Sequence, residues 1–242
     1  DQAQPKAREI AEVISARPTI EGAGVHLRRA FGAAEVPRLD PFLLLDDFRS
    51  ENPADYIAGF PWHPHRGIET VTYMLDGRVE HEDSIGNKGI IGQGDVQWMT
   101  SGSGIIHQEM PKIDRHRMGG FQLWVNLPRT NKMMDPRYQE VKSGQIPEVA
   151  PIEGVRMRVV AGEVHGVRGP VGDIATDPEY LDVQVDARTD FVHRVKPGYT
   201  VFAYLVEGRA SFDEDASDVV EDGHLVIFQN GDAVRVRTRD DS

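Results

Sequence analysis

The stretch FPWHPHRGIETVTYMLDG, residues 60–77, carries a strong signal for β-structure. Its second half, Thr70–Leu75, is rich in β-branched and aromatic residues and runs into an Asp-Gly pair, which favours a tight hairpin turn. Arg78–Glu82 leads back out of that turn. We therefore expect two strands that pair with each other across Asp76-Gly77.

Turn signals of this kind recur along the chain and separate short segments rich in Val, Ile, Thr, Tyr and Phe. The 242 residues include 24 Gly and 15 Pro, and pairs such as Gly86-Asn87 and Asn230-Gly231 interrupt the sequence. Phe121–Leu127 alternates apolar and polar residues, as a half-buried strand does. Residues 5–16 fit either a helix or a leading strand. The spacing predicts an all-β barrel or sandwich.

The composition excludes several classes of protein. A hydrophobic content of 39% indicates a globular chain, and the absence of cysteine excludes disulfides, thiolate metal sites and a cysteine nucleophile. Because 39 Asp and Glu outnumber 27 Lys and Arg, the net charge is -12, and we expect no direct nucleic-acid binding. No apolar run approaches the ~20 residues of a membrane helix, and no signal peptide is visible. We expect a cytoplasmic protein without a membrane partner.

Two parts of the chain resemble each other. TVTYMLDGRVEHED, from Thr70, is similar to VFAYLVEGRASFDED, from Val201, and GDVQWMTSG, from Gly94, aligns with GHLVIFQNG, from Gly223. The turn glycines at 77 and 208 are 131 positions apart, and those at 94 and 223 are 129 apart. Two copies of one β-barrel unit are therefore expected.

A segment with three prolines, residues 132–153, lies between the two copies and suits a linker. We accordingly expect an N-terminal barrel in residues 1–140 and a C-terminal barrel in residues 141–242.

Two histidines of the opening stretch have the spacing of metal ligands. His63 and His65 are two residues apart, and alternate side chains of a strand share a face, so both imidazoles can reach one ion. A second pair, His107 and Glu109, follows a Gly-rich turn in SGSGIIHQEMP. If the two strands are neighbours, three neutral imidazoles and one carboxylate converge.

This ligand set suits Fe(II), Mn, Ni, Cu(II) or Zn. Four protein ligands leave two positions of an octahedral ion open to water, dioxygen or a chelating substrate. Glu69 is an alternative to Glu109 as the carboxylate ligand, because residues 63, 65, 67 and 69 share a face in strand register. His81, which lies among acidic neighbours after the turn, is expected to face solvent.

The second copy offers an internal control for the metal site. The alignment places Arg194 and Lys196 at the positions of the first histidine pair. It places Val236 and Thr238 at the positions of His107 and Glu109. None of the four ligands is repeated, so the C-terminal barrel is expected to be metal-free.

Several segments resemble the signature sequences of the pirins, a family of the cupin superfamily. In the first half they are DPFLLLDDF from Asp40, HPHRGIETVTYMLDG from His63, GNKGIIGQGDVQWMTSGSGIIHQEM from Gly86 and PRTNKMMDPRYQ from Pro128. The second half is similar to the pirin C-terminal barrel through VFAYLVEGRASF and GHLVIFQNGD. Pirins usually continue beyond the point where this sequence stops, and it does not start with Met, so we expect a trimmed chain.

The resemblance implies a bicupin, in which two tandem cupin barrels of jelly-roll type hold one metal in the N-terminal barrel and none in the other. It implies iron, as Fe(II), as the usual metal, with Ni, Mn, Cu, Zn and Co as alternatives. The three histidines and the glutamate of the family correspond to His63, His65, His107 and Glu109. Glu69 corresponds to the glutamate that other cupins use as a ligand and pirins do not.

The resemblance also implies two kinds of function. Some pirins resemble quercetinases, which open flavonols with dioxygen. In that case Glu109 would leave the metal and act as a base on the flavonol hydroxyl, within about 2.6–3.2 Å. The pocket walls should be apolar and aromatic. Candidates are Trp62, Tyr73, Trp98, Met99, Phe121 and Trp124.

Other pirins act as regulators that bind protein partners, with the oxidation state of iron as the switch. The Gly-rich loop Asp83–Gly94 is the candidate contact for such a partner. We favour the enzyme, a quercetin 2,3-dioxygenase-like oxidoreductase for a small aromatic substrate and dioxygen. The reason is that structural metal sites are usually closed, whereas this one should keep open positions.

Overall fold

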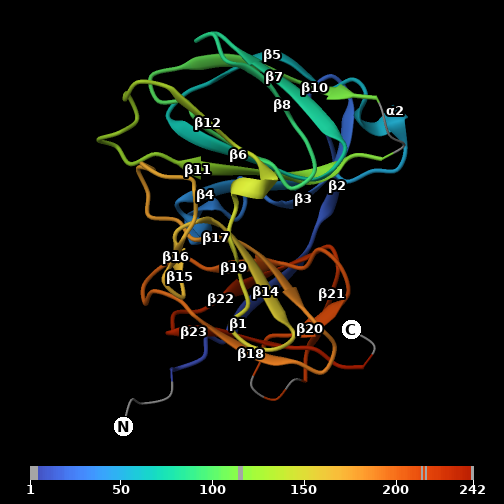
Figure 1. Ribbon diagram of the computed structural model, residues 1–242, viewed down its shortest axis with the longest axis vertical. Coiled ribbons are helices and arrows are strands. Elements are labelled where there is room, and N and C mark those ends of the chain that lie inside the picture. Colours follow the sequence, from blue (N-terminus) through green and yellow to red (C-terminus); the bar gives the residue numbers. More distant parts are fainter. Residues whose placement is uncertain (1–4, 114–116, 214, 216, 241–242) are drawn as a thin grey trace. The chain divides into compact units, whose positions relative to one another are not determined.

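The computed structural model describes residues 5–113, 117–213, 215 and 217–240 (Figure 1). Its described part consists of β-strands with three short helical turns: α1 (Val36–Leu39), α2 (Pro53–Tyr56) and the 3-10 turn η1 (Ser143–Gln145). Asn52 precedes α2, and its side chain accepts a hydrogen bond from the N–H of Ala54, as a helix cap does. Within the described ranges, no helix is long and apolar enough to cross a membrane.

The strands form two compact units, which are described separately. The first contains residues 17–147 and 159–180. The second contains residues 148–158 and 181–242, together with the first sixteen residues, as far as these are described. Within it β1 (Ile10–Ser15) pairs with β22 (His224–Phe228), so the leading segment is a strand and not a helix. The division of the chain at residue 140 stays a prediction.

Two antiparallel sheets make up most of the first unit. The larger has the strand order β12 (Arg137–Val141), β9 (Val96–Thr100), β6 (Ile68–Asp76), β11 (Gly119–Asn126), β4 (Phe42–Asp47), β3 (Val25–Phe31), β2 (Arg17–Glu21). The smaller has the order β5 (Phe60–His65), β10 (Ile105–Lys112), β7 (Arg78–Asp83), β8 (Lys88–Ile91). A separate hairpin joins β15 (Glu163–Val164) and β16 (Val167–Arg168).

The second unit contains a sheet of the order β1, β22, β19 (Phe202–Tyr204). A second sheet has the order β18 (Asp190–Arg194), β23 (Ala233–Arg237), β20 (Arg209–Ser211), β21 (Val219–Glu221). A third sheet has the order β13 (Glu148–Val149), β14 (Val155–Ala161), β17 (Tyr180–Val185).

The hairpin predicted across Asp76-Gly77 is wrong in its pairing, although both strands exist. β6 pairs with β9 and β11, whereas β7 pairs with β8 and β10, so the chain passes from one sheet to the other at the turn. Gly77 has φ +74°, a conformation that glycine adopts without strain. Both edges of each strand are already occupied, which leaves the two strands no edge with which to pair.

The predicted internal repeat is confirmed by the sheet topology. The order β5-β10-β7-β8 in the first unit recurs as β18-β23-β20-β21 in the second. The register agrees as well: Tyr73 lies opposite Val96, and the corresponding Tyr204 lies opposite Leu225. The chain therefore contains two β-barrels of one topology.

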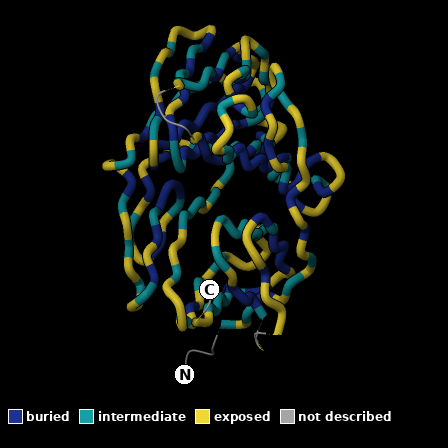
Figure 2. Tube along the Cα trace, turned by 90° about the vertical axis from the view of Figure 1, so that its right-hand side faces the viewer, coloured by how far each residue is buried: buried dark blue, intermediate teal, exposed yellow. Residues whose placement is uncertain are grey.

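Each unit has its own apolar core. Buried and exposed residues alternate along much of the chain (Figure 2). In the first unit the core cluster draws on both sheets and consists of Val25, Leu27, Phe48, Tyr56, Met74, Val79, Ile91 and Met118. In the second unit it consists of Ala210, Phe212, Val220, Val226, Phe228 and Val234. In the first unit, polar side chains of the two facing sheets meet elsewhere in the interior, where Thr72 contacts Glu109.

Candidate metal centre

The register of β10 with its two neighbours gathers the predicted ligands on one face of the smaller sheet. His107 lies opposite His63 on β5 and opposite Asp83 on β7. Glu109 lies opposite His81 on β7. Directly opposed residues of an antiparallel pair project to the same side, so these side chains share the face toward the larger sheet.

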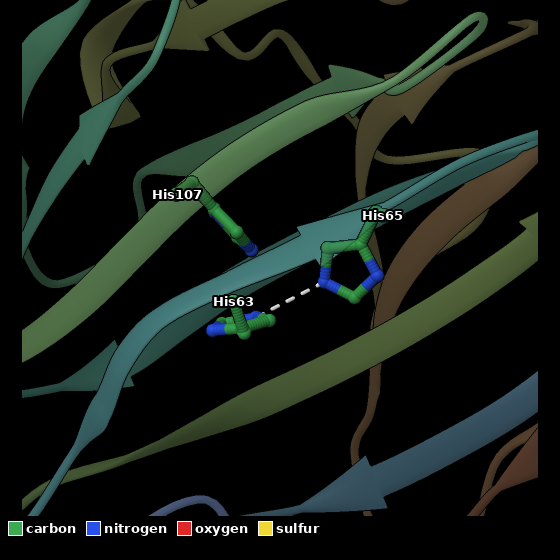
Figure 3. A group of neighbouring side chains, drawn as sticks. All are labelled: His63, His65 and His107. Carbon is green, nitrogen blue, oxygen red and sulfur yellow. Dashed lines mark hydrogen bonds between the residues drawn. The ribbon is translucent and has the colours of Figure 1, made fainter.

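Three imidazoles converge at this face (Figure 3). The ligand nitrogens of His63, His65 and His107 all lie within 4.8 Å of one another. The Nε2 atoms of His63 and His65 are 3.1 Å apart, and Nδ1 of His63 donates to the carbonyl of Pro61 at 2.7 Å. Since that carbonyl only accepts, Nε2 of His63 keeps its lone pair for the centre of the group.

The environment favours the neutral form of two of these rings, His65 and His107. Burial, with the nearby His107 and His63, lowers the pKa of His65 to about 4. Burial, with the nearby His63 and His81, lowers the pKa of His107 to about 3. The buried Nε2 of His107 has no hydrogen-bond partner among the described residues. Neutral imidazoles with free lone pairs are what a divalent metal requires, so the residues present fit such an ion.

Glu109 lies beside this group, and its carboxylate is hydrogen-bonded by a residue of the larger sheet. Glu109 itself is only 7% exposed, and its carboxylate lies within 4.8 Å of ligand nitrogens of His81 and His107. The hydroxyl of Thr72 donates to Oε1 of Glu109 at 3.0 Å and accepts from Nε2 of Gln122 at 2.7 Å. The structure thus brings the three predicted imidazole ligands together and places Glu109 in a second cluster that shares His107, with its carboxylate turned toward the larger sheet.

Glu69, the alternative carboxylate, is not at this centre. The strand that carries the two histidines ends at His65, and Gly67, at φ +69°, turns the chain into β6 of the other sheet. Glu69 is fully buried and accepts a hydrogen bond from Thr100 at 2.7 Å. It lies an odd number of positions from Thr72, so it projects from the opposite face of that sheet. The expected continuation of strand register past Gly67 was wrong.

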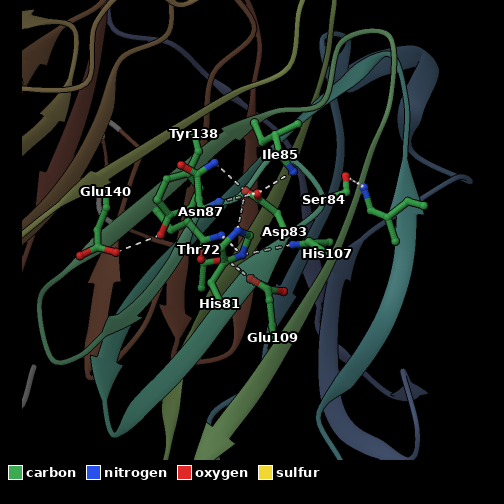
Figure 4. A network of polar contacts seen from close by, with 12 residues as sticks. Thr72, His81, Asp83, Ser84, Ile85, Asn87, His107, Glu109, Tyr138 and Glu140 are labelled. Atoms are coloured by element: carbon green, nitrogen blue, oxygen red, sulfur yellow. Dashed lines mark hydrogen bonds and ion pairs between the residues drawn. The ribbon is translucent and has the colours of Figure 1, made fainter.

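His81 was expected to face solvent and is instead fully buried, within the network of polar contacts drawn in Figure 4. Its ring stacks on Tyr138, with centroids 4.6 Å apart, and its Nε2 lies 3.1 Å from Oδ2 of Asp83. The strict alternation in VEHED could have indicated this. Glu80 and Glu82 point the other way, which places His81 and Asp83 on the buried side.

Two of the six apolar candidates for a pocket wall, Met99 and Trp124, lie on the face of the larger sheet that is turned toward the imidazoles. Thr72, which contacts Glu109, fixes that face of β6, and the cross-strand partners of Thr70 on the same side are Met99 and Trp124. The ring of Trp124 makes an edge contact with His65 at 5.2 Å. The other four are wrongly placed: Tyr73, Trp98 and Phe121 project from the opposite face, and Trp62 is 50% exposed.

The second barrel has no comparable group in its described residues. Both clusters of three side chains that could hold a metal ion in the described ranges lie in the first unit. The strand register also corrects the alignment of the copies: Val236 lies opposite Phe191, so Phe191 and not Arg194 takes the place of His63.

Two antiparallel barrels of one topology, with imidazoles from neighbouring strands gathered inside the first, define a two-domain cupin. Residues 24–125 match the family Pirin, and residues 180–242 match the Pirin C-terminal cupin domain. A pirin-like protein of Caulobacter vibrioides is 44% identical over 236 residues, which cover 97% of this chain and 84% of the relative. The chain belongs to the pirin family.

Two solved structures extend the comparison. Quercetin 2,3-dioxygenase from Acinetobacter baumannii is 30% identical, with a TM-score of 0.88 over 96% of this chain and 83% of its own. A bacterial pirin from Escherichia coli, in complex with nickel(II), is 20% identical, with a TM-score of 0.64 over 94% of this chain and 98% of its own. The second likeness is one of fold.

Proposed function

We propose that this protein is a metal-dependent dioxygenase of the quercetinase type, which opens flavonol-like aromatic substrates with dioxygen. The observation that carries the proposal is the group of three imidazoles, His63, His65 and His107, beside the buried side chain of Glu109. The similarity to a solved quercetin 2,3-dioxygenase over most of both chains supports the choice of reaction.

His63, His65, His107 and Glu109 would hold one divalent ion. Three imidazoles and a carboxylate suit several first-row metals, and we propose iron(II) before nickel, manganese, copper, zinc or cobalt. When bound, the ion supplies Lewis acidity and a path for electrons between substrate and dioxygen. Four protein ligands leave positions for a chelating substrate, which distinguishes this site from a closed structural one.

Glu109 would act as the base that takes the proton of the flavonol 3-hydroxyl. Its position between the imidazole group and Thr72 suits this role, because the Thr72 hydroxyl holds Oε1 while the carboxylate is away from the ion. The base must come within about 2.6–3.2 Å of the proton it removes. Burial of Glu109 keeps water from competing for that proton.

Met99 and Trp124 would contact the aromatic rings of the substrate. Both lie on the face of the larger sheet that looks toward the imidazoles, and Trp124 already touches His65. Apolar and aromatic walls with a few polar groups are usual for sites that bind such ligands. Both oxygen atoms of dioxygen would enter the ring-opened ester, and one ring carbon would leave as carbon monoxide.

A regulatory role is the alternative, and one observation favours it. Trp62 and Ile106 are about half exposed, 50% and 48%, and each is adjacent in sequence to a proposed ligand, His63 or His107. A change of charge at the metal would therefore occur one residue from an apolar surface on which a protein partner could dock.

The reaction itself provides the test. Fe(II)-loaded protein is given quercetin under air, and quercetin loss and carbon monoxide release are measured together. We expect one carbon monoxide for each quercetin consumed. Quercetin loss without carbon monoxide would contradict a ring-opening dioxygenase, and binding of quercetin without turnover would favour the regulatory role.

A further inference from the structure

His81 is buried next to the proposed metal ligands, and the mechanism above does not use it. Its two ring nitrogens face different partners (Figure 4). Nε2 lies 3.1 Å from Oδ2 of Asp83, and Nδ1 lies 3.4 Å from Nδ1 of His107. Nε2 of Gln97 lies 2.6 Å from the same Nδ1 of His81. Stacking on Tyr138, with an angle of 20° between the rings, fixes the plane of the imidazole.

Asp83 is fixed as an acceptor by its own loop. Its Oδ1 accepts from the backbone N–H groups of Ile85 and Asn87, at 3.1 and 2.9 Å. Its Oδ2 accepts from the side-chain amide of Asn87 at 2.9 Å. A carboxylate that receives three N–H donors presents lone pairs and no proton to its fourth neighbour.

The partners of His81 therefore determine where its proton lies. Facing a carboxylate, Nε2 carries the proton and donates it, which leaves the lone pair on Nδ1. That lone pair faces the Gln97 amide and Nδ1 of His107, and His107 can bond to it only as a donor. When Nδ1 of His107 carries a proton, the lone pair of His107 is on Nε2, and a ring nitrogen of His107 points toward His63 and His65 (Figure 3).

We propose that His81 is a positioning residue that holds His107 in the tautomer with the proton on Nδ1 and the lone pair on Nε2. Asp83, His81 and His107 then form one directed chain of hydrogen bonds that ends at the imidazole group. The inference rests on the metal site proposed above. Groups that orient a ligating histidine in this way typically contribute 10–100-fold to metal affinity.

Metal affinity tests the chain of hydrogen bonds without any turnover. Competition between the protein and a chelator for Co(II) is measured for the wild type, His81→Phe and His81→Asn. Asparagine can place an oxygen acceptor near the position of Nδ1, whereas phenylalanine cannot. We expect affinity to fall by about 10–100-fold in His81→Phe and to recover in part in His81→Asn.

Tyr138→Phe is the matched control. It keeps the aromatic face on which His81 stacks and removes only the hydroxyl that donates to Glu140 at 2.9 Å. We expect wild-type affinity in this variant. If His81→Phe binds Co(II) as tightly as the wild type, the inference is wrong. An equal loss in His81→Phe and His81→Asn would also overturn it, because it would indicate packing and not the acceptor.

A second measurement uses the wild type and does not depend on how the variants fold. Long-range ¹H–¹⁵N NMR of the Zn(II)-loaded protein assigns the tautomer of each histidine from its nitrogen shifts. We expect a proton on Nδ1 of His107 and a proton on Nε2 of His81. The opposite tautomer at either ring would overturn the inference. A protein that binds neither Co(II) nor Zn(II) at this site would overturn the proposed metal centre together with it.

Discussion

Nε2 of His63 lies 3.1 Å from Nε2 of His65, and the other nitrogen of His63 donates its proton to the carbonyl of Pro61. The lone pair of His63 is thereby directed at its neighbour, in a place where burial keeps His65 neutral and holds its pKa at about 4. A divalent cation satisfies lone pairs arranged in this way better than one shared proton does.

Metal binding should therefore stabilise the first barrel. Ligand at about 100 times its dissociation constant stabilises a folded protein by about 2.7 kcal/mol, so Co(II) should raise the temperature of its unfolding. Differential scanning calorimetry with and without the ion measures the shift. His63→Ala should abolish it, whereas His26→Ala, which removes an exposed histidine of β3, should not. An equal shift in both variants would contradict the assigned ligands.

Thr72→Val should lower kcat more than it lowers the affinity for the metal. The substitution keeps the shape of the side chain but removes the hydroxyl that donates to Glu109. A hydrogen bond to a charged group contributes about 1.5–3 kcal/mol, so we expect kcat to fall by about tenfold or more. Thr100→Val makes the same change at the hydroxyl that donates to Glu69 and serves as control. Equal kcat in the two variants would contradict the role given to Thr72.

Glu69→Gln should change how stability depends on pH and leave the metal content unchanged. Burial raises the pKa of Glu69 above its ordinary value of 4.5. As pH rises past 4.5, Glu69 loses its proton in the unfolded chain before it does so in the folded protein. The free energy of unfolding therefore falls until the pH exceeds the pKa of Glu69 in the folded protein. The variant lacks this decline, and urea unfolding at several pH values measures it. Loss of metal in Glu69→Gln would instead identify Glu69 as a ligand.

Arg8→Met should destabilise the second unit. The guanidinium of Arg8, a residue only 3% exposed, donates to the carbonyls of Lys196, Tyr199, Gln229 and Gly231 at 2.8–3.1 Å. Removing it takes this donor from four carbonyls in buried or partly buried hydrogen bonds, so we expect a loss of about 3 kcal/mol or more in the free energy of unfolding. Arg17→Met, at a side chain that is 72% exposed, should change it little. Chemical denaturation compares the two, and similar losses would contradict the account.

Much of the fold could be predicted from the sequence because strands and turns leave local patterns. The strands on either side of Gly77 were visible, but their pairing was not, since only the three-dimensional order of the sheets decides which edges are free. The repeat was detectable because Tyr73 and Tyr204 keep the same position in both copies.

The site residues, too, could be predicted only where their pattern is local in the sequence. His63 and His65 were detectable because their spacing of two is local, and the register of β10 brings His107 to them. Glu69 could not be separated from Glu109 by spacing alone, because one glycine at position 67 redirects the strand. His81 was missed because its acidic neighbours suggested solvent, although the alternation in VEHED places it with Asp83 on the buried side. Its stacking on Tyr138 arises only in the fold.

The most direct test of the central claim is oxygen consumption by anaerobically purified, Fe(II)-loaded protein after addition of quercetin. His63→Ala and His26→Ala are measured alongside, with iron content determined for each. We predict oxygen uptake by the wild type and His26→Ala and none by His63→Ala. No uptake by wild-type protein that holds one iron, or full uptake by His63→Ala, would contradict the account.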